Sequence, residues 1–267
     1  MKVLVYANEL KPESKKFLVE FSDLLKSENL DFEIISRDSL DKKVKADAVF
    51  VYGGDGTILA LTEFCAENNI PVIGFNAGKM GFLSEFEISE APLAVRNLKK
   101  GALKKDERSL LEINYGKKSF VALNDAVIQR TYNEESDGLI ISVSVSLDDI
   151  FVDEISGDGV IISTPTGSTA YSLSAGGAIL SPGINAFIMT PLSAHSLHHR
   201  PIVFSADSSC KIKVKSQNAA LFADGKKILS LSEGDLIELK KRGNQKLVFL
   251  RKEKSNFYTR LDDKLNK

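Results

Sequence analysis

The chain has 267 residues, of which 43% are hydrophobic and 27% charged, values typical of a globular protein with one large or two modest domains. Its 35 basic and 36 acidic side chains leave a formal net charge of −1, so the composition gives no overall attraction to nucleic acid or to acidic membranes. The two cysteines are too few for a disulfide framework and lack the spacing of a metal site, which favours a reducing compartment.

The first hundred residues or so alternate between apolar runs and segments with helical spacing. We predict strands over residues 2–7, 32–35, 48–52 and 71–75, and helices over residues 12–27, 57–67 and 90–99. This alternation predicts an α/β, Rossmann-like domain over residues 1–100, with a parallel sheet covered by helices on both faces. In such a domain, ligands bind at the carboxyl ends of the strands.

The pattern changes near Gly101 to short segments with a period of two, the clearest of which runs from Leu139 to Leu147. The other predicted strands are 110–114, 120–129, 150–155, 160–162, 210–214, 219–223, 237–240 and 246–250, and the predicted turns include 224–225 and 242–244. These segments predict an all-β, sandwich-like domain over residues 101–250. The tail, 251–267, contains a short predicted helix at 256–265 and is expected to pack back on the first domain.

No apolar run approaches the roughly 18 residues that a membrane span needs. The N-terminal stretch from Met1 to Tyr6 is typical of a first strand and not of a signal peptide. We therefore expect a cytoplasmic protein with no membrane partner.

A glycine-rich segment, Gly53-Gly54-Asp55-Gly56-Thr57, follows the predicted strand 48–52 directly. Its three glycines allow the backbone to bring bare N–H groups close to another molecule, and the helix expected after them favours an anion such as phosphate. A carboxylate in such a place would repel phosphate unless it holds a metal ion or accepts a proton from an attacking hydroxyl. The alternative is a tight turn in which Asp55 caps the next helix.

A second segment, from Gly157 to Gly177, is rich in glycine and hydroxyl groups: between Ser163 and Ser174, seven of twelve residues are Ser or Thr. Ser168 or Thr169 could cap a short helix that runs toward Ala175. A solvated turn with a capped helix would account for two or three of these hydroxyls. We favour a site for a sugar or nucleotide, with Asp158 placed to reach a hydroxyl or amide of the ligand.

Four segments, in this order and spacing, resemble the NAD kinases, which belong to a superfamily with the diacylglycerol and sphingosine kinases and the phosphofructokinases. They are Gly53 to Thr57, the pair Asn124-Asp125, the run Gly157 to Gly177, and Ala194-His195-Ser196-Leu197 with Arg200-Pro201. The first is shared across the superfamily, whereas the third is specific to the NAD kinases. Two departures stand out: Asp125 replaces a glutamate that is usual in the family, and Ala194 replaces a proline before His195.

The resemblance implies transfer of the terminal phosphoryl group of ATP, or of polyphosphate, to the 2′-hydroxyl of the adenosine ribose of NAD. A divalent cation, Mg²⁺ or Mn²⁺, would neutralise much of the phosphate charge. Asp55 is the predicted catalytic group, which accepts or orients the proton of that hydroxyl. The predicted phosphate-binding residues are Gly53, Gly54, Gly56 and Thr57.

Residues predicted to bind NAD follow from the same resemblance. Asn124 and Asp125 would contact the adenosine and the second ribose, and Asp158 and Ser174 would face the nicotinamide half. The residues expected around the adenine and its ribose are Phe82, Thr166, Thr169, Ala170 and Tyr171. Asp224 would complete the site, although an aspartate before glycine is also an ordinary turn residue.

The resemblance also implies a homo-oligomer, a dimer or a tetramer, whose subunits share the active site. Two other classes of protein share parts of this pattern. A lipid or sphingoid kinase of the superfamily would need an apolar acceptor groove, which the hydroxyl-rich segment near Tyr171 argues against. A non-catalytic nucleotide-binding regulator would be favoured by loss of Asp55 or of Asn124-Asp125, and both are present. The metal ligands, the use of ATP or polyphosphate and the acceptance of NADH are left open.

Overall fold

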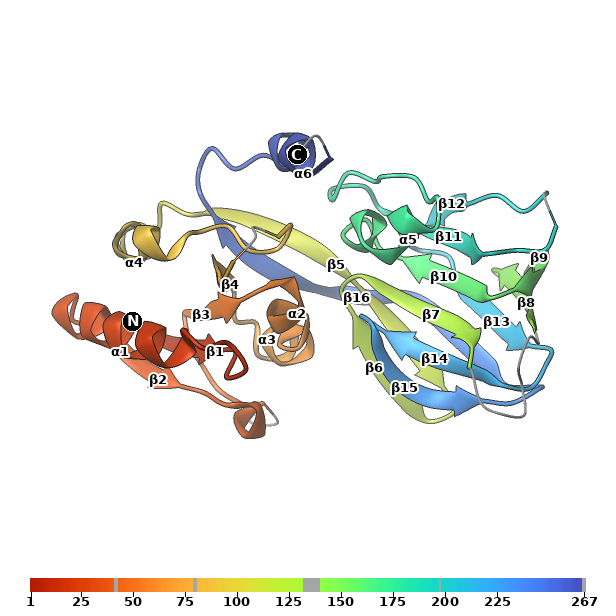
Figure 1. Cartoon of the computed structure of the whole chain (residues 1–267), viewed down its shortest axis with the longest axis horizontal. Helices are drawn as coiled ribbons and strands as arrows, with labels where there is room; N and C mark the ends of the chain where they lie inside the picture. Colours follow the sequence, from red (N-terminus) through yellow and green to blue (C-terminus); the bar gives the residue numbers. More distant parts are fainter. Residues whose placement is uncertain (41–42, 79–80, 132–139, 197, 266–267) are drawn as a thin grey trace. The chain divides into compact units, whose positions relative to one another are not determined.

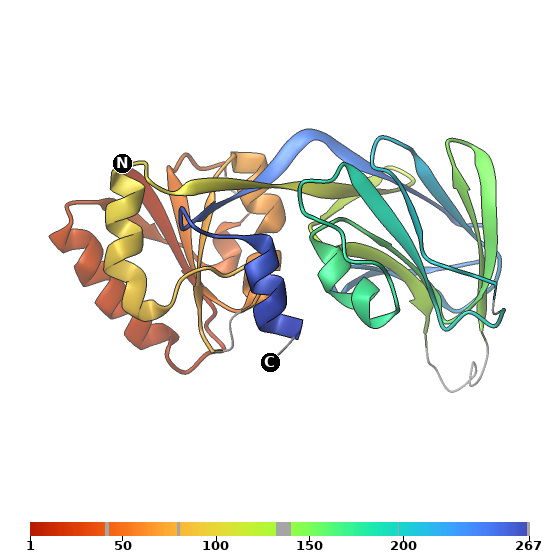
Figure 2. The same cartoon turned by 90° about the horizontal axis from the view of Figure 1, so that it is seen from above.

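The computed structural model describes residues 1–40, 43–78, 81–131, 140–196 and 198–265 (Figures 1 and 2). It divides into two compact units, one formed by Met1–Arg108 with Lys246–Lys267 and the other by Ser109–Gln245. Leu139 and Leu197, which belong to segments singled out above, lie outside the described residues. No described helix is both long and apolar enough to cross a membrane.

The first unit is an α/β domain with a parallel sheet, as predicted. Its strands run in the order β2-β1-β3-β4, and the end of β16 joins β4 in parallel through Phe249 and Val72. The strands are β1 (Lys2–Ala7), β2 (Asp31–Ile34), β3 (Ala48–Gly53) and β4 (Val72–Asn76). The helices are α1 (Ser14–Ser27), η1 (Arg37–Ser39), α2 (Asp55–Leu59), α3 (Thr62–Asn68), η2 (Ile88–Glu90), α4 (Ala91–Lys99) and α6 (Phe257–Leu265).

Residues of β1, β3 and β4 are buried on both faces of the sheet, as expected for parallel strands. On one face Phe50 and Phe75 pack with Phe21 of α1, and the same core includes residues of α4. Figure 2 shows these two helices, α1 in red and α4 in yellow, side by side. On the other face Gly74 leaves room for Ile58 of α2, because an added Cβ would lie only 2.9 Å from the Ile58 Cδ1 atom. This packing places the start of α2 at the carboxyl end of β3.

The single helix predicted over 57–67 is wrong, because the structure has two short helices there. The N–H of Leu61 bonds to the carbonyl of Ile58, three residues back, and this tighter turn separates α2 from α3. Both Ile58 and Leu61 are thereby fully buried.

The second unit is an antiparallel sandwich. One sheet has the order β12-β11-β10-β7-β14-β15, and the other contains β16, β13, β8 and β9 with β5 and β6 (Figure 1). Residues of both sheets share one apolar core, which includes Ile128 and Ile162 from the first and Val145 and Ile212 from the second.

The elements of this unit are bounded as follows. The strands are β6 (Lys118–Ala122), β7 (Asp125–Arg130), β8 (Ile141–Leu147), β9 (Ile150–Gly157), β10 (Gly159–Ser163), β11 (Ala186–Leu192), β12 (Ile202–Ser205), β13 (Cys210–Val214), β14 (Ala219–Ala223) and β15 (Lys226–Leu231). Two short helices, η3 (Gly167–Thr169) and α5 (Tyr171–Ser174), follow β10, and two strands, β5 (Lys104–Tyr115) and β16 (Leu236–Arg251), have residues in both units.

Two predictions for this unit are wrong, and three strands were missed. The strand predicted over 120–129 is two strands, β6 and β7, in different sheets. The turn predicted at 242–244 is absent, since β16 continues through Gly243 and pairs with different strands at its two ends. Strands β11, β12 and β15 were not predicted.

Candidate functional site

Asp55 is the first residue of α2, but it does not cap that helix. The N-cap residue is Gly54, and no side-chain capping bond is made. Instead, the Asp55 carboxylate accepts hydrogen bonds from the backbone N–H of Phe82 at 2.8 Å and of Leu83 at 3.2 Å. The turn-and-cap alternative is therefore wrong for this side chain, because the chain holds the carboxylate in place with two amides from a distant loop.

The glycines around Asp55 fall into two groups. A Cβ on Gly53 would lie 2.3 Å from Thr57 Oγ1, and one on Gly81 would lie 1.9 Å from Asp55 Oδ1, so packing requires glycine at both positions. At Gly54 and Gly56 an added Cβ would have nothing within 4 Å. Their backbone faces open space, as expected where a phosphate approaches closely.

Thr57 is buried, and its Oγ1 accepts a hydrogen bond of 3.2 Å from the side-chain amide of Asn8. Sequence reasoning missed Asn8, which follows β1 at the same sheet edge as Asp55. The signal that could have found it is its place at the carboxyl end of a parallel strand.

Asp224 connects two distant loops of the sandwich. Its Oδ1 accepts from the N–H of Asn124 at 2.7 Å and of Asp125 at 3.2 Å, and its Oδ2 accepts from Leu123 N–H at 2.9 Å. Asp224 and Gly225 have φ of 48° and 77°, so they form the predicted turn. The carboxylate has a role beyond that turn, because its three hydrogen bonds end β6 and start β7.

Asp125 lies beside Asp224 and is only 4% exposed. Burial, together with the nearby Asp224 charge, raises the pKa of Asp125 to about 7. Burial also raises the pKa of Asp224, although its three backbone hydrogen bonds act in the opposite direction. Among the described residues, no hydrogen bond engages the carboxyl group of Asp125 or the side-chain amide of Asn124, so both polar groups are available to a ligand.

The hydroxyls of the segment after β10 divide into an internal and an accessible group. Ser163 Oγ and Thr164 N–H both donate to the carbonyl of Asn124, at 3.1 and 2.8 Å. Ser168 Oγ accepts from Leu180 N–H and donates to Pro165, so it does not cap a helix. The buried hydroxyl residues are Ser163, Thr164, Thr166, Ser168 and Ser172. These contacts join the segment to Asn124, which a solvated loop would not require.

Four of the residues predicted to bind NAD are exposed or partly exposed: Thr169, Tyr171 and Ser174, whose hydroxyls form the accessible group, and Ala170, which has no hydroxyl. Tyr171 is 45% exposed, which is unusual for a large aromatic side chain beside a core. Helix α5 begins at Tyr171 without a side-chain cap, so the predicted capping by Ser168 or Thr169 is wrong.

Gly167 brings this segment against Asn124. A Cβ there would lie 2.1 Å from the Asn124 carbonyl oxygen, a backbone atom that cannot swing aside. The structure thus brings Asn124, Asp125, Asp224 and the 163–168 segment together.

Asp158 lies apart from this cluster. It precedes β10, whereas Asp125 pairs with Ser163 at the other end of that strand, so about 16 Å of strand separate them. Its carboxylate pairs with Arg130 at 2.8 Å. Phe82 is partly exposed in the loop that holds Asp55. Lys79 and Met80, in the same loop, lie outside the described residues.

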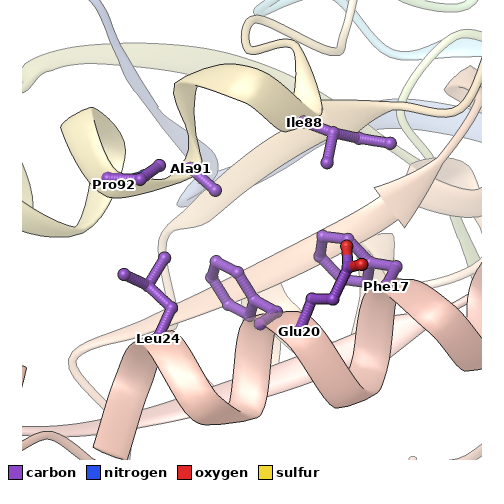
Figure 3. Close-up of a pocket in the computed structure, with 7 residues that line it drawn as sticks. Phe17, Glu20, Leu24, Ile88, Ala91 and Pro92 are labelled. Atoms are coloured by element: carbon purple, nitrogen blue, oxygen red, sulfur yellow. The ribbon is translucent and has the colours of Figure 1, made fainter. Parts of the chain in front are cut away.

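Neither a metal cluster among the described residues nor the apolar pocket of the α/β unit marks the site. The described residues contain no group of three or more His, Cys, Asp or Glu that could hold a metal ion. A pocket of about 190 Å³ opens between α1 and the η2–α4 segment (Figure 3). Apart from Glu20 its lining is apolar, formed by Phe17, Phe21, Leu24, Ile88, Ala91 and Pro92. None of these groups suits a phosphate, so the pocket is not part of the predicted site.

A carboxylate held directly after a parallel strand, beside open glycine backbone, suits phosphoryl transfer to a hydroxyl, and a phosphotransferase is the class of protein that this arrangement favours. The sequence profile of the ATP-NAD kinase N-terminal domain matches residues 4–103, and that of the ATP-NAD kinase C-terminal domain matches residues 123–251. The chain belongs to the ATP-NAD kinase family, so it is a kinase with NAD as acceptor and ATP as donor.

Individual relatives agree with this assignment. The NAD kinase of Caldicellulosiruptor saccharolyticus is 37% identical over 266 residues, 99% of each chain. That of Carboxydothermus hydrogenoformans is 38% identical over 84% of this chain and 81% of its own.

Solved structures are similar along the whole chain. A yeast NADH kinase, crystallised with NADH, has a TM-score of 0.85 and 27% identity, covering 100% of this chain and 87% of its own. An NAD kinase from Archaeoglobus fulgidus, crystallised with ATP, has a TM-score of 0.81 and 22% identity. The match covers 100% of this chain and 99% of the other, and it supports the fold.

Proposed function

We propose that this enzyme transfers the terminal phosphoryl group of ATP to the 2′-hydroxyl of the adenosine ribose of NAD, which yields NADP. Membership of the family supports the two substrates. The observation that carries the mechanism is the Asp55 carboxylate, held by two backbone amides and next to the open backbone of Gly54 and Gly56. In this proposal Asp55 accepts the hydroxyl proton or orients the hydroxyl for in-line attack.

The NAD-binding role belongs to the sandwich unit in this proposal. The side chains of Asn124 and Asp125 would bind hydroxyl or amino groups of the adenosine and second ribose. Asp125 is buried, and a buried polar group without a hydrogen-bond partner is otherwise costly, whereas Asn124 is partly exposed and open to a ligand. Asp224 holds the backbone of both residues in place. Four residues of the hydroxyl-rich segment would border the adenine and its ribose. They are the buried Thr166 and the more accessible Thr169, Ala170 and Tyr171.

Asp158, Ser174 and Phe82 complete the proposed NAD contacts. Because Asp158 lies at the far end of β10 from Asp125, we propose that a homo-oligomer, a dimer or a tetramer, brings residues of two subunits to one active site. We also propose a cytoplasmic location, because two free cysteines, Cys65 and Cys210, suit a reducing compartment.

A divalent cation, Mg²⁺ or Mn²⁺, is compatible with these residues only if the substrate supplies most of its ligands. Since the described residues offer no cluster of three or more acidic or imidazole ligands, the cation would be bound chiefly by the donor phosphates and by water, with Asp55 as one protein carboxylate near the phosphate-binding backbone. When bound, it neutralises charge on the transferred phosphoryl group. The Gly53 to Thr57 backbone would contribute N–H donors to the same phosphates.

The test is a coupled assay for NADP formation by the purified wild type with ATP, Mg²⁺ and NAD, beside Asp55→Asn. We expect NADP from the wild type and a loss of roughly 10²- to 10⁴-fold in kcat in the variant, the range for a positioned acid–base group. Polyphosphate in place of ATP tests the second donor. Near-normal turnover of a folded Asp55→Asn protein would remove the role of Asp55. Phosphorylation of diacylglycerol or a sphingoid base, without NADP, would favour a lipid kinase.

A further inference from the structure

A cluster of buried charged side chains lies beneath the loop that holds Asp55. Arg251, the last residue of β16, is 2% exposed and is the largest fully buried side chain. It pairs with Asp106 at 2.5 Å through Nε and with Glu85 at 3.1 Å through Nη1. Arg108 pairs with Asp106 at 2.7 Å. The cluster therefore joins β5, β16 and the segment after β4 within the α/β unit.

The charge state of the cluster follows from these contacts. Burial alone would raise the pKa of Asp106, but the hydrogen bond and charge of Arg108, with those of Arg251, lower it to about 2. Burial lowers the pKa of Arg251. Arginine still keeps its proton at neutral pH, so Arg251 and Asp106 are both charged. Buried charges are costly unless they stay paired, so the two side chains must keep this geometry.

The same guanidinium group contacts the loop that binds Asp55. Arg251 Nη2 donates to the carbonyl of Phe82 at 3.4 Å, and Nη1 donates to the carbonyl of Leu83 at 3.3 Å. The N–H groups of these two residues donate to the Asp55 carboxylate. The planar peptide group between Phe82 and Leu83 therefore has Arg251 on its oxygen and Asp55 on its nitrogen.

The C-terminal helix extends the cluster. Arg260 of α6 pairs with Glu85 Oε2 at 2.6 Å, and Ser255 Oγ donates to the same oxygen at 3.0 Å. Glu85 is itself tied to β4, because its N–H donates to the carbonyl of Gly74 at 3.0 Å. Glu85 is therefore held by three side chains and fixes one branch of the Arg251 guanidinium group.

We propose that Arg251 is a positioning residue for Asp55, acting through the Phe82–Leu83 peptide, and that Arg260 of α6 supports it through Glu85. This inference rests on the proposed function. Buried ion pairs add little net stability compared with apolar side chains of the same volume, whereas their hydrogen-bond geometry is specific. The arginine fork spans two carboxylates and two carbonyls, which the single ammonium group of a lysine cannot do.

The decisive variant is Arg251→Lys, which keeps the charge and removes the fork. We expect kcat to fall by about 10- to 100-fold, the scale of a misplacement near 1 Å, with smaller changes in KM for NAD and ATP. In an Asp55→Asn background the same change should have little further effect, because the two residues act in series. The matched control is Lys252→Gln, which removes the neighbouring ion pair with Glu90 at 2.6 Å but no contact to the loop; its kcat should stay near wild type.

A second readout does not depend on activity. Amide hydrogen exchange of the 81–85 segment should become faster in Arg251→Lys and not in Lys252→Gln, with the α1 helix unchanged in both. If Arg251→Lys does not fold, Arg260→Lys is tested by the same two readouts. The inference would be overturned if Arg251→Lys lowered kcat by the same factor in the wild type and in Asp55→Asn. Unchanged amide hydrogen exchange of the 81–85 segment would also overturn it. If the wild type makes no NADP, the proposed function fails, and the exchange result alone decides whether Arg251 positions the loop.

Discussion

The Asp224 Oδ1 atom accepts a hydrogen bond of 2.7 Å from the backbone N–H of Asn124, a residue 100 positions earlier in the chain. The bond lies in the short connection of the sandwich where β6 ends and β7 begins. It also fixes the backbone of Asn124, whose side chain we propose as an NAD contact.

Asp224→Asn should destabilise the protein by about 1–3 kcal/mol, the usual cost of a buried N–H that loses its acceptor. An amide oxygen can still accept from Asn124, but its NH₂ group would face the N–H of Leu123. Urea unfolding measures the change. Asp207→Asn is the control, since Asp207 is exposed, accepts a hydrogen bond of 2.7 Å from the exposed side-chain amide of Asn185 and lies 3.7 Å from Lys241; it should change the unfolding free energy by less than about 0.5 kcal/mol. Equal effects of the two substitutions would contradict the role of Asp224.

The raised pKa of Asp125 predicts a specific pH dependence of stability. Its ordinary pKa is 3.8, and burial with the Asp224 charge raises it to about 7 in the folded protein. Between these values the folded state binds a proton that the unfolded state has lost. The contribution is complete below about pH 4 and disappears as the pH rises through about 7, with a slope of at most ~1.4 kcal/mol per pH unit.

Unfolding free energies measured from pH 5 to pH 8 test this linkage. The wild type should lose stability with rising pH more steeply than Asp125→Asn, which cannot titrate at this position. Parallel pH profiles for the two proteins would show that Asp125 titrates normally.

Gly167→Ala should be destabilising and should weaken NAD binding. The new Cβ would lie 2.1 Å from the Asn124 carbonyl oxygen, so the backbone must move. We expect a loss of about 1–3 kcal/mol, as for other overpacked sites, and a higher KM for NAD. Gly183→Ala is the matched control in the same unit, because its Cβ meets nothing within 4 Å. Similar melting temperatures for the two variants would rule out the predicted clash.

Both cysteines should be unreactive in the native protein. Cys65 and Cys210 are buried, and burial raises the pKa of each thiol to about 12, so almost no thiolate forms at neutral pH. Titration with a chromogenic disulfide reagent should detect the two thiols only after denaturation. Rapid native reaction of either would show that its segment opens readily.

Local patterns were sufficient for much of the fold and for part of the site. The alternation of apolar runs and helical spacing predicted the parallel unit, and the period of two in Ile141–Leu147 predicted the antiparallel one. The Gly53 to Thr57 motif marked the strand end where Asp55 lies, because a tight turn and a close backbone approach both require glycine.

What failed were features decided by partners far along the chain. The break between β6 and β7 comes from the Asp224 carboxylate, and β16 continues through Gly243 because each of its ends pairs with a different strand. Arg251 gave no sequence signal, since a lysine- and arginine-rich end of a strand is usually solvated.

The sequence by itself determined the class of each domain, the glycine-rich turn after β3 and the residue types present in that turn, because these depend on short-range periodicity and backbone freedom. Only the tertiary structure decided what Asp55, Asp125 and Arg251 contact, since hydrogen bonds and burial join residues that the local pattern does not relate. Those contacts hold the Asp55 carboxylate on the 82–83 amides and leave the Asp125 carboxyl group without a hydrogen-bond partner among the residues that the structure describes.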